Sequence, residues 1–65
     1  MPTPEQIRVL GAEAATAGDI LGAAICARAA GDPFDHFALS DEERQMVRSM
    51  TQWEAIDEAS RMLIV

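Results

Sequence analysis

The chain has no lysine, no tyrosine and a single cysteine, and these shortages exclude several classes of protein. Because Cys26 is alone, no internal disulfide can form. Five arginines stand against eleven acidic residues, which gives a net charge of −6 and leaves no cluster of cations for phosphate. Nucleic acid and anionic membranes are therefore poor partners, whereas a basic protein surface is a suitable one.

Long hydrophobic runs are also missing. The longest, over residues 20–27, is interrupted by Gly22 and is far shorter than the ~20 residues that span a bilayer. The N-terminal residues 1–5 have neither the basic start nor the apolar stretch of a signal peptide. We expect a cytoplasmic protein that has no membrane partner and needs no cofactor.

The length of 65 residues predicts a single domain, residues 1–65. The apolar share of 49% is too high for a disordered chain, although much of it is alanine and adds little buried volume. A domain this short buries only about 60% of its unfolded surface and is marginal alone. A partner or a second copy of the chain could supply the missing stability.

Capping patterns predict an all-α fold of three helices. The first, over residues 4–17, opens with a capping box in which Thr3 and Gln6 take part. Gly18 can end this helix, and Asp19 can cap the second one, over residues 20–30.

The second helix is apolar on nearly all sides, which predicts that it is buried between other elements. The segment 33–39 that follows it is too short for a full helix. We expect a turn there that inserts Phe34 and Phe37 into the core.

The last helix is predicted over residues 41–63, behind a capping box formed by Ser40 and Glu43. A second capping box, Thr51-Gln52-Trp53-Glu54, raises the alternative of a break near residues 49–51 and a fourth helix. We favour one helix, because its apolar residues stay in phase across this point, and we place Trp53 in the core. The apolar stripe consists of Met46, Val47, Met50, Trp53, Ile56 and Leu63.

The strongest functional pattern lies on the opposite side of this last helix. Spacings of three and four place three carboxylates on one helical face. Three more lie at the start of the helix, where the helix dipole favours negative charge. The alternative to a binding surface is an ordinary solvated face. The predicted partner-binding residues are Asp41, Glu42, Glu43, Glu54, Asp57 and Glu58.

No catalytic site and no metal site is predicted. A DNA-reading helix-turn-helix would need hydrogen-bonding side chains within residues 20–24, and none of these can bond a base edge. Cys26 could be a nucleophile with His36 as its base, but the apolar surroundings favour a structural thiol. One histidine and two aspartates within residues 32–36 are too few for a metal site. We therefore predict a protein that is not an enzyme.

Three short motifs carry a resemblance: Ala17-Gly18-Asp19, Ile25-Cys26 and Gly31-Asp32. Together they resemble a pattern in short uncharacterised proteins of proteobacteria and their phages. The resemblance covers residues 14–32 and implies a helical hairpin and a bacterial or mobile-element origin, with no activity attached. In size, acidity and lack of catalytic residues the chain is also similar to phage-encoded inhibitors such as anti-CRISPR proteins.

These observations predict a phage-type inhibitor that mimics nucleic acid and blocks a basic, nucleic-acid-binding host protein through its acidic helical face. The alternative is a structural or assembly subunit that forms homo-oligomers through its apolar C-terminal helix. The four apolar residues 62–65 cannot all face one core from the end of one helix, so some of them are expected to be exposed or covered by another chain. The residues of this alternative surface are Trp53, Met62, Ile64 and Val65.

Overall fold

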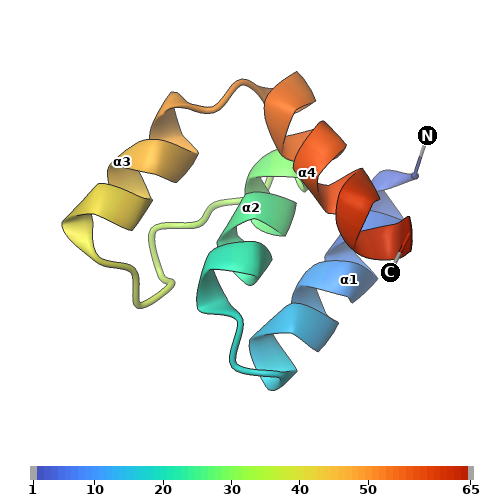
Figure 1. Cartoon of the computed structure of the whole chain (residues 1–65), viewed down its shortest axis with the longest axis horizontal. Helices are drawn as coiled ribbons and strands as arrows, with labels where there is room; N and C mark the ends of the chain where they lie inside the picture. Colours follow the sequence, from blue (N-terminus) through green and yellow to red (C-terminus); the bar gives the residue numbers. More distant parts are fainter. Residues whose placement is uncertain (1, 65) are drawn as a thin grey trace.

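The computed structural model describes the backbone of residues 2–64 and the side chains of residues 2–62. Within this part the chain is all-helical, and its elements are α1 (Pro4–Thr16), α2 (Ile20–Ala30), α3 (Asp41–Ser49) and α4 (Gln52–Ile64). α2 lies at the centre and packs chiefly against α1 and α4, with α3 more loosely attached at the side (Figure 1). None of the four helices has both the length and the apolar character needed to cross a membrane.

The predicted capping residues begin the first two helices. The Thr3 hydroxyl accepts the Gln6 N–H at 3.2 Å, and the Gln6 side chain accepts the Thr3 N–H at 2.9 Å. Asp19 accepts the Gly22 N–H at 2.9 Å. Between these starts, Gly18 takes the left-handed conformation at φ 86°, which is sterically open to glycine and costs other residues about 1–2 kcal/mol.

Gly11 permits a close crossing of α1 and α2. It is buried in the middle of α1, and a Cβ placed on it would lie 3.0 Å from the Cβ of Cys26. A glycine inside a helix costs roughly 1 kcal/mol relative to alanine. The close approach of the two helices is the physical reason for a glycine at this position.

The core is built mainly from small side chains. No charged side chain is fully buried among the described residues, so the charges lie at or near the surface. Phe34 and Phe37, in the segment between α2 and α3, pack against the core as predicted. The buried hydrophobic residues are Ile7, Ala23, Ala24, Ile25, Cys26, Ala29, Val47, Ala55 and Ala59.

The prediction of one continuous helix over residues 41–63 is wrong. Met50 is extended, at φ −67° and ψ 137°, and ends α3. The Thr51 hydroxyl then accepts the Glu54 N–H at 3.1 Å, while the Glu54 carboxylate accepts the Thr51 N–H at 3.0 Å. This is the capping box Thr51-Gln52-Trp53-Glu54 that raised the alternative of a fourth helix, and it starts α4 as a separate helix. The Arg28 guanidinium ties the connection to α2 by donating to the Met50 carbonyl at 3.2 Å.

The placement of Trp53 in the core is also wrong, because its side chain is 70% exposed. The extended residue at the break changes the direction of the chain, so the apolar stripe of α3 does not continue in register on α4. The completely buried residues of α4 are instead Ala55 and Ala59. Of the predicted stripe, Val47 is buried and Met50 and Ile56 pack against the core. Met46 is 44% exposed, and the side chain of Leu63 lies outside the described residues.

Candidate functional site

The break divides the six predicted partner-binding carboxylates into two groups. The first is the α3 group, Asp41, Glu42 and Glu43, in the first turn of α3. The second is the α4 group, Glu54, Asp57 and Glu58. Figure 1 shows the first turn of α3 at the edge of the molecule that is remote from α4. The structure therefore does not bring the six together on one continuous ridge.

The α3 group has a structural role that accounts for its charge. The Glu43 carboxylate accepts the Ser40 N–H at 3.0 Å, and the Ser40 hydroxyl accepts the Glu43 N–H at 3.2 Å. Asp41 and Glu42 are exposed at the N-terminal end of the helix, where the unpaired N–H groups favour negative charge. These three residues initiate α3, and nothing in their geometry requires a partner.

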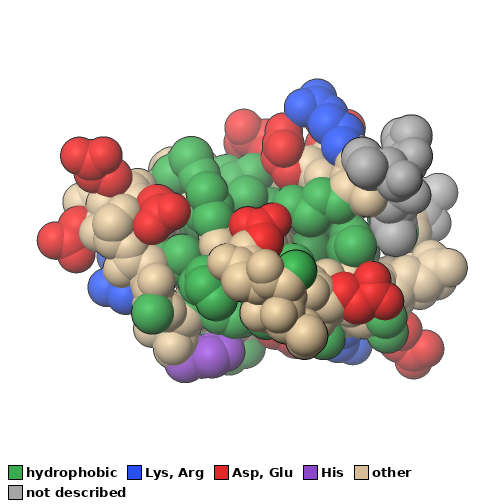
Figure 2. Space-filling view, turned by 60° about the horizontal axis from the view of Figure 1, so that its bottom comes forward, with side chains coloured by type: hydrophobic (Ala, Val, Ile, Leu, Met, Phe, Trp, Pro, Cys, Tyr) green, Lys and Arg blue, Asp and Glu red, His purple; other side chains and the backbone are tan. Residues whose placement is uncertain are grey.

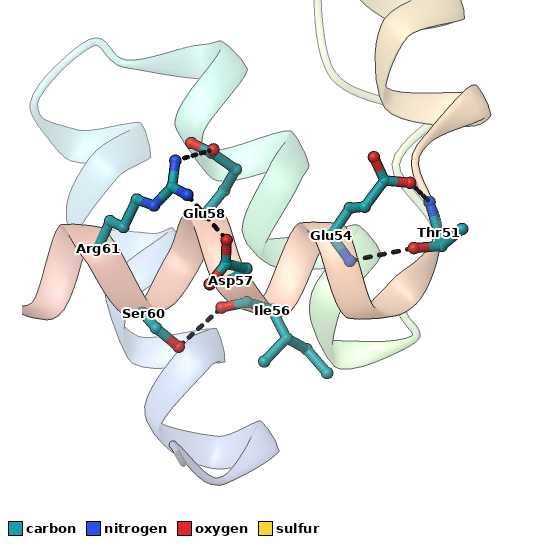
Figure 3. A network of polar contacts seen from close by, with 7 residues as sticks. All are labelled: Thr51, Glu54, Ile56, Asp57, Glu58, Ser60 and Arg61. Atoms are coloured by element: carbon teal, nitrogen blue, oxygen red, sulfur yellow. Dashed lines mark hydrogen bonds and ion pairs between the residues drawn. The ribbon is translucent and has the colours of Figure 1, made fainter.

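The α4 group is arranged around a single guanidinium. Arg61 donates from Nη1 to Glu58 Oε1 at 2.8 Å and from Nη2 to Asp57 Oδ2 at 2.9 Å (Figure 3). Glu54 lies nearer the start of the helix, where it closes the capping box with Thr51. The outer face of α4 thus presents three carboxylates and one guanidinium, which leaves it negative overall.

The ion pairs on this face are weak ones. The side chains of Arg61 and Asp57 are each 66% exposed, and that of Glu58 is 44% exposed. Pairs in such contact with water contribute about 0–1 kcal/mol, so an outside cation can replace Arg61 at little cost. The hydrogen bond from the Thr51 backbone N–H, and to a smaller extent hydrogen bonding with the Thr51 side chain, keeps the pKa of Glu54 below its usual value. This carboxylate therefore stays charged.

Trp53 lies on this face of α4 and is exposed, although the sequence predicted it in the core. It precedes Asp57 by four residues on α4, and residues at that spacing are neighbours on the surface of a helix. An exposed indole next to carboxylates combines a large apolar surface with negative charge. The Thr51 capping box contained the information that would have revealed this, because a helix that restarts there turns Trp53 away from the stripe of α3.

Acidic side chains are not confined to these two groups. On the side of the molecule in Figure 2, hydrophobic side chains are spread over the middle and acidic side chains lie among and around them. Hydrophobic residues that pack only partly covered against the core include Leu21, Phe37 and Leu39. Negative charge therefore occurs in many parts of the protein, and what distinguishes the outer face of α4 is the exposed indole one helical turn before Asp57.

Cys26 and His36 line one groove between α1, α2 and the segment that follows α2, with a volume of about 290 Å³. The Cys26 side chain is only 1% exposed, and its Sγ lies 4.0 Å from Met62 Sδ. Burial raises the pKa of the thiol, with a smaller contribution from Asp19. His36 is exposed and stacks on Phe37, with the ring centroids 4.3 Å apart. A buried thiol with a raised pKa is a poor nucleophile.

The acidic residues near His36 are engaged by arginines. Arg8 Nε donates to Asp32 Oδ2 at 2.9 Å, and its Nη2 donates to Asp32 Oδ1 at 3.1 Å. Arg48 lies 3.5 Å from Asp35. Within the part of the chain that the structure describes, no three histidine, cysteine or acidic side chains converge as a metal site would require.

No protein-family model, no curated protein and no solved structure matches the chain.

Proposed function

We propose that the chain is a non-enzymatic protein-binding module of the cytoplasm that docks the outer face of α4 onto a basic protein surface. The observation that carries the proposal is the 70% exposure of Trp53, four residues before Asp57 on the same helix. Tryptophan is enriched among the residues that dominate binding energy at protein interfaces. A large indole that the small core leaves in water fits a role outside the core.

The charge of the chain favours a basic partner. The whole protein carries −6, and the outer face of α4 has three carboxylates for one guanidinium. Negative charge of this kind steers a positively charged partner and repels nucleic acid. Carboxylates along a rigid helix can occupy arginine and lysine side chains that otherwise bind phosphates. A phage-type inhibitor that blocks a nucleic-acid-binding host protein would work in this way.

The proposal is tested by comparative capture from a nuclease-treated bacterial lysate. The immobilised wild-type protein is compared with the double variant Asp57→Lys/Glu58→Lys. A matched control, Glu5→Lys/Glu13→Lys, changes the net charge equally at exposed positions of α1. We expect basic nucleic-acid-binding proteins on the wild type and on the control, and their loss from the α4 variant, while all three melt cooperatively. Capture that is equal on all three proteins would refute docking through α4.

Self-association through α4 is the second candidate function, and the exposure of Trp53 favours it as well. Met62, which the sequence analysis assigned to this surface, is instead partly buried and packs against the core beside Cys26. The side chains of Ile64 and Val65 lie outside the described residues. Analytical ultracentrifugation over a wide concentration range separates the two candidates, because self-association predicts a dimer in the absence of any partner.

A further inference from the structure

The indole of Trp53 is the largest hydrophobic group that the described residues leave in water. It lies in the first turn of α4 with 70% of its surface exposed. The other strongly exposed large hydrophobic residues, Val9 and Met46, are smaller and lie on α1 and α3. An exposed Trp on a helix with an excess of carboxylates is complementary to a group that has both a flat surface and a positive charge.

Arginine has both properties. Its planar guanidinium stacks on aromatic faces and pairs with carboxylates in the same plane, whereas the lysine ammonium is a compact and strongly hydrated point charge. The structure already shows that the carboxylates of this face accept a guanidinium, since Arg61 bonds Asp57 at 2.9 Å and Glu58 at 2.8 Å. Because these pairs are exposed, another arginine can take the place of Arg61.

Resting on the proposed function, we propose that the outer face of α4 binds an arginine side chain of its protein partner, which stacks on Trp53 and pairs with Asp57 in exchange for Arg61. The partner is thus an arginine-bearing protein segment. Arg61 acts as an internal competitor that holds the carboxylates until the partner arrives.

A second copy of the chain fits this face less well. A symmetric dimer brings the same patch of each protomer together. The outer face of α4 would then oppose its own carboxylates, and like charges across an interface are unfavourable. Charge complementarity therefore selects a basic occupant over a second copy.

The chain supplies its own probe, because Trp53 is its single tryptophan and it has no tyrosine. The ligands are two synthetic peptides of equal length, one with four arginines separated by glycines and the other with four lysines in their place. We expect the arginine peptide to change the Trp53 emission saturably and to bind several-fold more tightly than the lysine peptide. Affinities are measured independently with fluorescein-labelled peptides, so that variants without tryptophan can be compared.

Two variants test the two parts of the proposal. Trp53→Ala should weaken arginine-peptide binding by about 3-fold to 30-fold, which is the range of cation–π stacking from exposed to desolvated sites. Arg61→Ala should strengthen binding, because it removes the competitor. The matched control is Arg48→Ala, which changes the net charge equally on α3, where Arg48 pairs with Asp35. We expect Arg61→Ala to bind more tightly than Arg48→Ala.

Each outcome decides between the inference and the proposed function. If both peptides bind and Trp53→Ala binds as tightly as the wild type, arginine stacking is refuted while an acidic docking surface stands. If neither peptide nor any basic protein binds, both are refuted. If Arg61→Ala gains no more than Arg48→Ala, the exchange with Arg61 is refuted. A Trp53 emission that changes with protein concentration alone, together with a dimer in sedimentation, assigns the face to a second copy.

Discussion

Replacement of Thr51 by alanine distinguishes a broken C-terminal helix from a continuous one by the sign of its effect. In the structure the Thr51 hydroxyl caps α4 by accepting the Glu54 N–H at 3.1 Å. Loss of such a cap costs about 1 kcal/mol, with a range of about 0.5–2 kcal/mol. Within a continuous helix the same change would stabilise the protein by up to about 0.7 kcal/mol, since alanine is the better helix former.

The two possibilities give opposite shifts of the melting temperature. For a domain of this size, 1 kcal/mol corresponds to about 4–8 °C. We therefore expect Thr51→Ala to melt several degrees below the wild type when unfolding is followed by far-ultraviolet circular dichroism. Glu54→Gln should cost less, because a glutamine side chain can still accept the Thr51 N–H.

Two other threonines serve as controls for this measurement. Thr3→Ala removes the equivalent cap of α1 and should lower the melting temperature by a similar amount. Thr16→Ala lies within the last turn of α1, where the hydroxyl bonds the Ala12 carbonyl at 2.9 Å, and should have little effect. A melting temperature of Thr51→Ala equal to or above that of the wild type, with Thr3→Ala lowered as expected, would refute the break at Met50.

Three further predictions concern other parts of the fold. Val47→Ala should lower the free energy of unfolding by roughly 2 kcal/mol in urea denaturation, because Val47 is 0% exposed and is the buried residue that anchors α3. The hydrogen bond from Arg8 holds the Asp32 pKa below its ordinary 3.8. This lowered pKa means that the pair stabilises the fold fully above pH 3.8 and is lost as the pH falls through the folded-state pKa. The stability difference between the wild type and Asp32→Asn should therefore vanish in strong acid, and a difference that stays constant with pH would contradict the assignment. Cys26 should react with a thiol reagent much more slowly in the native protein than in urea, because the buried thiol has a raised pKa. Equal rates in both conditions would contradict its burial.

The helix starts could be predicted from the sequence because capping is local. Thr3, Asp19 and Ser40 lie at the expected positions, since a short polar side chain bonds a backbone N–H only two or three residues away. The same local chemistry occurs at Thr51, but the apolar phase of residues 41–63 favours one continuous helix. Periodicity describes one helix at a time, and a single extended residue at Met50 removes the phase relation between two of them.

The position of Trp53 could not be predicted from size and hydrophobicity alone. α4 packs mainly on α2, and its completely buried residues are Ala55 and Ala59. Ala55 and Ala59 thus occupy the side of α4 that faces the core, and Trp53 lies outside it with its side chain 70% exposed. For the candidate site, the helical spacing predicts the carboxylates of α4 as a group with Arg61 offsetting part of their charge, and Arg61 does bond Asp57 and Glu58. The indole beside Asp57 was not predicted.

The alanine seam at Ala24, Ala55 and Ala59, all 0% exposed, has a consequence for how so short a chain can hold one conformation. Burying a leucine or a methionine freezes rotations that an unfolded chain enjoys, whereas alanine has no side-chain rotation to lose. Alanines bury less apolar surface along this seam than larger side chains would, but their burial costs almost no side-chain conformational entropy. Small side chains also fix the distance between the two backbones, because each added methyl group would force the helices apart. Larger residues should therefore be tolerated at the exposed positions of the bundle and should destabilise it at the buried alanines.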